Sequence, residues 1–245
     1  MMDPRAGSFG TAADAYERGR PPYPEKALDW LLPGGERLSS DGGYRVLDLG
    51  AGTGKLSRQI RRRGLDVTAV DPSEGMLAEL RRVLPGVPAL LGSAESIPLP
   101  DDSVDVVLVA QAWHWVDPAR ALPEIARVLT PGGRLGLIWN VRDERSDWVR
   151  RLGTIIGSAE EGREPRMGPP FGPVETTEFA WAHTIAADAL LDMVASRSRI
   201  ILLPADERAA VLAQVRQLTA THPELLGRAS YELPYVTECA RATLL

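Results

Sequence analysis

The sequence predicts an α/β fold with a parallel sheet, on three observations. The run 44–49 is short and rich in Val and Leu, as in a strand that is covered on both faces. It ends at a loop with glycine at every second position, Gly50, Gly52 and Gly54, and a helical pattern follows. A second buried strand, 65–70, ends in Asp71, about twenty residues beyond the loop. This order of strand, glycine loop, helix, strand and acid predicts a nucleoside-binding half-fold.

Two residues at the loop favour one nucleoside cofactor over another. The dinucleotide pattern has a third glycine where this chain has Lys55, and it does not need the acid Asp48 at the strand end. A carboxylate at this loop would repel a pyrophosphate, but it suits a ligand that carries an ammonium group. S-adenosylmethionine has an amino-acid end and no phosphate, so it fits the loop better than a dinucleotide does.

The stretch 46–57, VLDLGAGTGKLS, resembles the first motif of the class I S-adenosylmethionine-dependent methyltransferases. The resemblance covers 44–140 and implies a doubly wound, Rossmann-like sheet of seven strands whose last strand is antiparallel. It also implies that Met76 lies beside the adenine, although a methionine at such a position is usually a core residue. The loop and the second strand then supply these cofactor residues: Asp48, Gly50, Ala51, Gly52, Thr53, Asp71 and Pro72.

The stretch 92–100, GSAESIPLP, resembles the adenine-recognition segment of the same family. There a side chain and the backbone N–H that follows it bind the adenine edge, which needs one donor and one acceptor at a fixed spacing. Ser93, Ala94 and Glu95 are the candidates by position. The alternative is a loop built on a simple turn.

The segment 110–117, AQAWHWVD, follows the expected fourth strand, 106–109. It resembles the corresponding segment of the small-molecule methyltransferases that include trans-aconitate methyltransferase. Ligands of open α/β sheets bind beyond the carboxyl ends of the strands, so this loop is expected to face the transferred methyl group. Gln111 is assigned to the cofactor, and Trp113, His114 and Trp139 are assigned to the substrate pocket.

His114 is the candidate catalytic residue, because histidine titrates in the range useful to a base. A hydroxyl acceptor needs a base, whereas a carboxylate acceptor is already ionised and would only be held in line. Packing between the two neighbouring tryptophans is the competing interpretation.

The flanking regions are expected to complete a single domain over 1–245. Residues 1–43 form a helical cover, in which Tyr16 and Tyr23 line the substrate pocket or belong to surface helix packing. Residues 141–245 carry the last two strands, 178–185 and 231–240. The expected helices are 11–18, 25–32, 56–63, 73–84, 119–129, 146–156, 186–197 and 205–221, of which the last two would cap the acceptor. A Pro-Gly-Gly turn, 131–133, ends the helix 119–129 before the fifth strand, 134–139.

Composition restricts the partners. The net charge of −5 disfavours nucleic acid and anionic membrane, and one cysteine excludes an internal disulfide. No stretch approaches the length of a membrane span, so a cytoplasmic protein is expected. The expected assembly is a monomer or a homodimer, and no metal ion is expected. The predicted function is methyl transfer to a small-molecule oxygen, a carboxylate or hydroxyl. The alternatives are an NAD-linked oxidoreductase and a non-catalytic S-adenosylmethionine-binding protein.

Overall fold

The computed structural model describes residues 21–33, 43–157, 164–195 and 197–245. The chain divides into two compact units. The core unit comprises Pro22–Trp139, Gly162–Phe179 and Thr237–Leu245, and the helical unit comprises Met1–Pro21, Asn140–Glu161 and Ala180–Val236. The expectation of a single functional domain stays a prediction.

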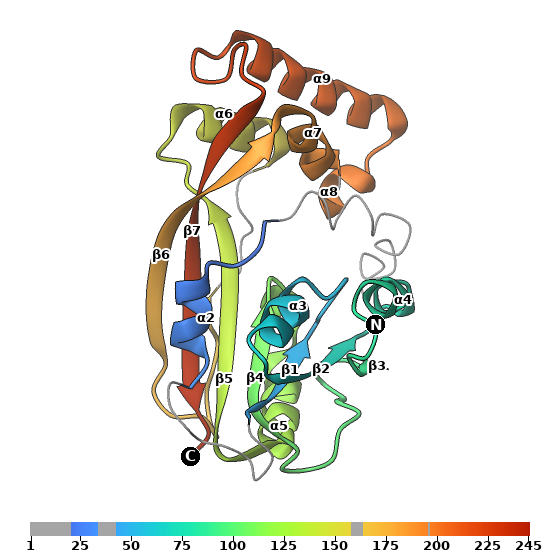
Figure 1. The fold of residues 1–245 in the computed structure, drawn as a ribbon, viewed down its shortest axis with the longest axis vertical. Coiled ribbons are helices and arrows are strands. Elements are labelled where there is room, and N and C mark those ends of the chain that lie inside the picture. The colour runs from blue at the N-terminus through green and yellow to red at the C-terminus, as the bar shows by residue number, and fades with distance from the viewer. Residues whose placement is uncertain (1–20, 34–42, 158–163, 196) are drawn as a thin grey trace. The chain divides into compact units, whose positions relative to one another are not determined.

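A seven-stranded sheet of order β3-β2-β1-β4-β5-β7-β6 runs through the described residues (Figure 1). Strands β1 to β5 pair in parallel, and the arrow of β7 runs opposite to that of its neighbour β5. This arrangement confirms the predicted doubly wound sheet with an antiparallel last strand. The strands are β1 (Arg45–Leu49), β2 (Asp66–Asp71), β3 (Ala89–Leu91), β4 (Val104–Ala110), β5 (Leu129–Arg142), β6 (Glu175–Ala186) and β7 (Ser230–Thr243).

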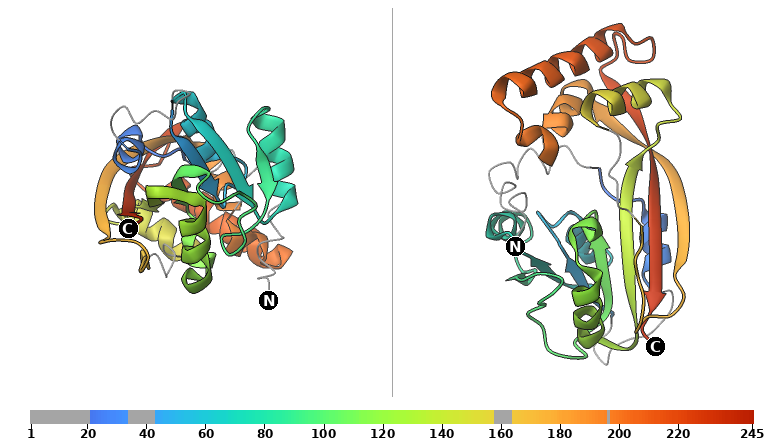
Figure 2. Two further views of the ribbon diagram at one scale, coloured as in Figure 1. Left: turned by 90° about the horizontal axis from the view of Figure 1, so that it is seen from below. Right: turned by 180° about the vertical axis from the view of Figure 1, so that it is seen from behind.

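The helices close to the sheet follow the predicted apolar patterns. In the core unit, α2, α3 and α4 share one apolar cluster with β1 and β4, which includes Leu28, Ile60 and Leu80. Helix α5 lies on the opposite side of the strands from α2, as the front view of Figure 1 and the rear view of Figure 2 show. The helices are α2 (Glu25–Leu31), α3 (Lys55–Arg62), α4 (Glu74–Val83), the 3₁₀ turn η2 (Trp113–Trp115), α5 (Pro118–Val128), α6 (Asp147–Ile156), α7 (Ala187–Ala195), α8 (Ser198–Ile201) and α9 (Ala205–Thr221).

The Pro-Gly-Gly stretch 131–133 is not a turn between two elements, which corrects the prediction. It lies inside β5, which begins at Leu129 directly after α5. The pairing with β4 jumps from Val104–Leu129 to Val106–Arg134, so the extra residues form a bulge. Gly132 takes a positive φ of 75° there. Strands β6 and β7 are also longer than expected, at 175–186 and 230–243 in place of 178–185 and 231–240.

The helical unit has an apolar core of its own, built from α6, α7, α9 and the strand ends beside them. A hydrogen bond between His222 and Asp147 joins the end of α9 to α6. His222 Nδ1 accepts the Glu224 N–H at 3.2 Å, so Nε2 carries the proton and donates to Asp147 at 3.2 Å. This bond explains why the pKa of Asp147 is lowered, with Arg151 and Arg150 contributing as well.

Candidate cofactor and acceptor site

The three glycines of the loop after β1 all take left-handed backbone angles, with φ of 75°, 55° and 85°. Their surroundings differ. A Cβ on Gly54 would lie 2.8 Å from Leu80 Cγ, whereas a Cβ on Gly52 would meet nothing within 4 Å. Gly54 is therefore required by the contact between α3 and α4, and Gly52 borders open space. Gly52, unlike Gly54, therefore leaves room for a ligand against the main chain.

Asp48 is fully buried at the end of β1. Its Oδ2 accepts a hydrogen bond of 2.6 Å from the Ser57 hydroxyl in the first turn of α3, and its Oδ1 has no partner among the described residues. Burial raises the pKa of this carboxyl to about 7, the Ser57 bonds oppose that shift, and the nearby Asp71 adds to it. A buried carboxylate with one open oxygen is the group that a cationic ligand would stabilise most.

Asp71, at the end of β2, holds the glycine loop. Its Oδ2 accepts the Gly52 N–H at 2.8 Å and its Oδ1 accepts the Ser73 N–H at 2.8 Å. Burial raises its pKa, and these two N–H groups oppose the shift. Each carboxylate oxygen keeps a second lone pair, so Asp71 retains the capacity to accept the ribose hydroxyls assigned to it.

The predicted adenine segment lies beside the end of β2. The Gly92 N–H donates to the Asp71 carbonyl at 3.2 Å, and Ser93 and Ser96 exchange two backbone bonds of 3.2 Å that close a tight turn. Glu95 turns its carboxylate toward the start of α5 and accepts the Asp117 N–H at 3.0 Å.

Three further cofactor candidates differ in their exposure. Ala94 and Met76 are buried, whereas Pro72 is exposed. The structure thus brings the segment and Asp71 together, while Glu95 is engaged in holding a neighbouring loop.

The end of β4 borders the same loop. A Cβ on Gly50 would lie 2.9 Å from Ala112 Cβ, so the turn after β4 and the glycine loop are in contact. Gln111 takes a φ of 57°, which is uncommon outside glycine, and its N–H donates to the Ile138 carbonyl at 2.9 Å. A strained residue held at the carboxyl end of a central strand is typical of functional sites.

The aromatic residues predicted for the acceptor lie at this sheet edge. Trp113 is buried in η2, and Trp139 directly follows Ile138 in β5 and is also buried. Neither indole N–H has a hydrogen-bond partner among the described residues. The His114 ring contacts the Trp115 ring, with centroids 4.7 Å apart, and Trp115 is exposed. His114 therefore packs against Trp115, beyond the end of β4, and its role stays a prediction.

Of the two tyrosines predicted for the N-terminal cover, only Tyr23 lies among the described residues. Tyr16 lies outside the described residues. Tyr23 is buried in the apolar cluster with Ala27 and Leu28. Its N–H donates to Gln59 Oε1 at 2.9 Å, and its carbonyl accepts from Gln59 Nε2 at 2.7 Å. These contacts give Tyr23 a packing role against α3, and the predicted role at the substrate remains untested.

Sequence reasoning missed Ser57 and Gln59, the two polar residues on the buried side of α3. Both are spaced to face the sheet together with Leu56 and Ile60. A polar residue on an apolar helix face is a weak signal, because it does not name its partner. Only the fold shows that one bonds Asp48 and the other a distant backbone.

The described residues hold no group of three or more His, Cys, Asp or Glu that could bind a metal ion. Within the same residues, no helix is long and apolar enough to cross a membrane.

The fold and the glycine loop define a nucleoside-binding protein of the Rossmann-like type, and comparison with known proteins specifies the family. Residues 47–137 match the model of a methyltransferase domain. The chain is 58% identical to an uncharacterized methyltransferase of Mycobacterium tuberculosis, over 97% of this chain and 96% of that protein. It is 35% identical to an uncharacterized methyltransferase-like protein of Schizosaccharomyces pombe, over 94% and 93%.

The chain belongs to the class I S-adenosylmethionine-dependent methyltransferases. A solved structure from Anaeromyxobacter dehalogenans, named for a type II methyltransferase, has a TM-score of 0.63 and 26% identity. It covers 91% of this chain and 97% of its own. These findings confirm the enzyme class and the cofactor, and they exclude the NAD-linked alternative. They do not single out trans-aconitate methyltransferase.

The name of a more distant relative specifies the methyl acceptor of that relative. The malonyl-[acyl-carrier protein] O-methyltransferase of Serratia marcescens is 43% identical over 133 residues, which is 52% of this chain and 49% of that protein. The similarity is therefore confined to about half of each chain.

Proposed function

We propose that this methyltransferase transfers a methyl group to an oxygen of a small-molecule acceptor, a carboxylate or a hydroxyl. The observation that carries the proposal is the pair of buried indole N–H groups of Trp113, in the turn after β4, and Trp139, in the neighbouring strand β5. An N–H donor orients an acceptor that bears lone pairs, which an oxygen does. The distant relation to an O-methyltransferase supports the same class of acceptor.

The cofactor supplies a methyl group that is already activated by the positive sulfur, so the residues have to bind, orient and exclude water. We assign the open Oδ1 of Asp48 to the cationic amino-acid end and the Asp71 carboxylate to the ribose. Gly52 leaves the space that the ligand occupies. The turn Ser93–Ser96, with Ala94, flanks the adenine.

His114 has a role that depends on the acceptor. For a hydroxyl, its ring takes the proton as the new bond forms. For a carboxylate, no proton has to move, and His114 holds the acceptor in line.

The outer parts of the chain are assigned to the acceptor side. We propose that residues 1–43 and 141–245 belong to one functional methyltransferase domain together with the cofactor half, 44–140. A small molecule remains the predicted partner, since a net charge of −5 gives no field that attracts nucleic acid. A cytoplasmic monomer or homodimer remains the prediction for location and assembly.

A label-transfer screen tests the function. Methyl-labelled cofactor is incubated with the enzyme and a panel of carboxylates, fatty acids and phenols, and the labelled product is isolated. Hydrolysis of the product by mild base identifies an ester, and its resistance identifies an ether. Transfer to nitrogen or carbon alone would overturn the proposed acceptor class.

Two glycine variants make the screen specific to the loop. Gly52 and Gly64 both have positive φ, 55° and 75°, and a Cβ on either would meet nothing within 4 Å. Alanine therefore introduces a similar backbone strain at both positions, on the order of 1 kcal/mol. We expect Gly52→Ala to lose cofactor binding and transfer, while Gly64→Ala keeps both. Equal activity of the two variants would move the cofactor away from this loop.

The same assay measures the role of His114. If it acts as a base, His114→Ala lowers kcat about a hundredfold or more with cofactor affinity intact, and removes a limb of the pH profile. A smaller loss without a change in the pH profile indicates orientation. An unchanged kcat and kcat/KM would remove His114 from the mechanism.

A further inference from the structure

The segment that contains the adenine candidates has no regular secondary structure to hold its shape. Residues 92–103, all within the described part of the chain, belong to none of its helices or strands. Pro98 and Pro100 have no N–H to donate, and Ile97 between them and the turn is buried. The N–H and carbonyl of a buried residue need hydrogen-bond partners, so other parts of the chain have to supply them.

Two side chains of α5 supply these partners. Glu124 Oε2 accepts the Ile97 N–H at 3.0 Å. Arg127 Nη2 donates to the Ile97 carbonyl at 2.9 Å, and its Nη1 donates to the Leu99 carbonyl at 2.8 Å. Both polar groups of the buried Ile97 backbone are therefore bound by the same helix.

The guanidinium group of Arg127 uses all five of its N–H donors. Besides the two carbonyls, it donates to Asp101 at 2.7 Å and twice to Glu124 at 2.9 Å. The bonds from Arg127, together with the Ile97 N–H, lower the pKa of Glu124, so this carboxylate stays ionised at neutral pH. A lysine has three donors on a single nitrogen and cannot reproduce the planar fork.

The segment in turn binds the start of the same helix. Glu95 accepts the Asp117 N–H at 3.0 Å, and Asp117 directly precedes the first residue of α5. The hydrogen bonds therefore connect the segment to the beginning of α5 through Glu95 and to its second half through Glu124 and Arg127. All of these residues belong to the core unit.

We propose that Glu124 and Arg127 are positioning residues for the cofactor, which hold the segment 93–99 in the shape that recognises the adenine base. Recognition of adenine needs a donor and an acceptor at a fixed spacing, and a shift of the backbone that carries them would separate the two. The two side chains act through the Ile97 and Leu99 backbone. The inference rests on the assignment of Ser93 and Ala94 to the adenine under the proposed function, and it does not involve the methyl acceptor.

The test compares two ligands that differ only in the base. S-adenosylhomocysteine and S-inosylhomocysteine are titrated separately into the full-length protein by calorimetry. In the second ligand the 6-amino donor is replaced by a carbonyl acceptor and N1 carries a hydrogen, so the order of donor and acceptor is inverted. We expect the wild type to bind S-adenosylhomocysteine about tenfold or more tightly than S-inosylhomocysteine. The ratio of the two affinities measures recognition of the base.

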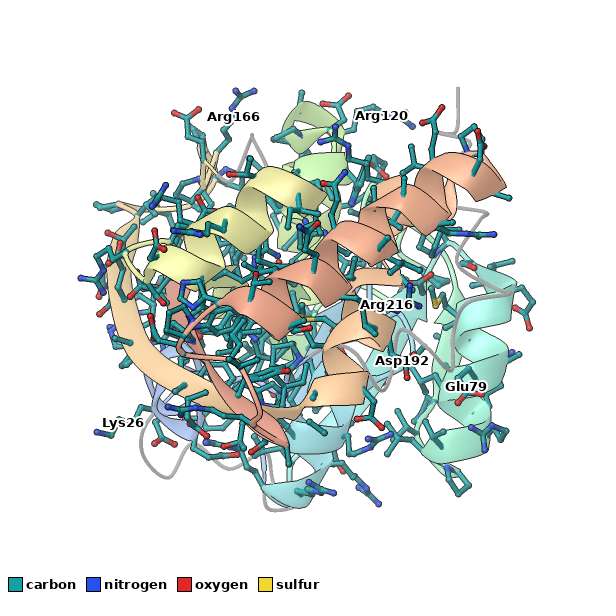
Figure 3. All side chains as sticks on the ribbon, turned by 90° about the horizontal axis from the view of Figure 1, so that it is seen from above. Lys26, Glu79, Arg120, Arg166, Asp192 and Arg216 are labelled. Atoms are coloured by element: carbon teal, nitrogen blue, oxygen red, sulfur yellow. The ribbon has the colours of Figure 1, made fainter. Side chains whose placement is uncertain are left out.

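Arg127→Lys keeps the positive charge and removes the fork. We expect its affinity for S-adenosylhomocysteine to fall about tenfold to a hundredfold, because several charge-assisted bonds are lost. Its affinity for S-inosylhomocysteine should change much less, so that the preference for adenine narrows. Arg120→Lys is the matched control, since Arg120 is an exposed arginine of the same helix (Figure 3) and should keep both affinities. Circular dichroism checks that each variant is folded.

Glu124→Gln provides a second variant that keeps the test decisive if Arg127→Lys fails to fold. Glutamine retains an oxygen that can accept the Ile97 N–H, and it removes the charge that binds Arg127. The preference for adenine should therefore narrow, by a smaller factor than in Arg127→Lys.

Three results would overturn the inference. The first is a wild type that binds both ligands equally well. The second is a folded variant of Arg127 or Glu124 with unchanged affinities, and the third is an equal loss of affinity for both ligands, which indicates a general structural role. If the preference narrows as expected and the label-transfer screen finds no oxygen acceptor, the proposed acceptor class fails while the positioning role stands. If label transfer to an oxygen occurs and the variants keep the preference, only the positioning role fails.

Discussion

Asp48 illustrates how one residue opposes stability and serves binding. Its carboxylate is removed from water, keeps hydrogen bonds from Ser57 alone among the groups that lower its pKa, and has a pKa of about 7 in place of 3.8. The folded protein therefore holds the proton more tightly than the unfolded chain does. The stabilising contribution of this proton is complete below the unfolded pKa and is lost as the pH rises through about 7. At neutral pH the unliganded protein thus carries a strained, partly ionised group that a cationic ligand would relieve.

The variant Asp48→Asn tests this balance. Asparagine keeps an acceptor for Ser57 and has no charge to bury, so the unliganded variant should be more stable than the wild type at pH 8, by on the order of 2–4 kcal/mol. The advantage should disappear near pH 4. Cofactor affinity should fall at pH 8, because the opposite charge is lost. Urea unfolding across pH and calorimetry of cofactor binding measure the two effects.

Asp66→Asn is the matched control for that variant. Asp66 is the first residue of β2 and is exposed, so the same chemical change there should leave stability and affinity unchanged. A stability profile of Asp48→Asn that follows the wild type at every pH would mean that Asp48 is not strained by burial.

At the scale of a single element, α3 connects three parts of the core unit. Its first turn bonds Asp48 through Ser57, its middle bonds the backbone of Tyr23 through Gln59, and Arg63 at its end bonds Glu25 of α2. The helix that follows the glycine loop therefore also anchors the segment that precedes the sheet. The loop and the end of the N-terminal segment are linked by one rigid helix.

Gln59→Leu should show how much this anchor contributes. The substitution keeps the volume of the side chain and leaves the Tyr23 N–H and carbonyl buried without their Gln59 partner, at a cost of about 2–3 kcal/mol. Urea unfolding monitored by circular dichroism gives the free energy. Arg62→Gln, an exposed change on the same helix, should stay within about 0.5 kcal/mol of the wild type. Two equal losses would show that Gln59 adds no more than a surface residue does.

At the scale of the whole molecule, the described cofactor candidates all belong to the core unit. The glycine loop, the two aspartates, the adenine segment and the end of β4 all lie between Pro22 and Trp139. The helices α6, α7, α8 and α9 belong to the helical unit. Because each unit has a separate apolar core, a ligand of the first does not have to rigidify the second.

Hydrogen exchange with and without S-adenosylhomocysteine tests this division. Protection on binding should be greatest in 44–56, 68–77, 92–95 and 110–116, and small in α9 (Ala205–Thr221). Gly52→Ala provides the control, since the ligand should then change nothing. Protection of α9 as strong as that of the loop would show that the helical unit takes part in holding the cofactor.

The sequence alone determined the sheet, the glycine loop and the class of enzyme. These features follow from short-range patterns: an apolar run, alternating glycines, an acid at a set distance and a second motif in order. The same patterns were less informative for 131–133, where a bulge keeps the chain in β5 although proline and glycine usually end an element.

The tertiary structure decided which partners the polar residues take. Ser57 and Gln59 differ little on a helix until the positions of the sheet and of the N-terminal segment beside it are known. A hydrogen bond or a shared charge depends on distances of a few ångströms between elements far apart in the chain, and residue spacing does not encode those distances. The pattern of apolar residues and glycines is local, so the strands and the loop can be predicted from the sequence. The environment that sets the pKa of Asp48 exists only after the chain has folded.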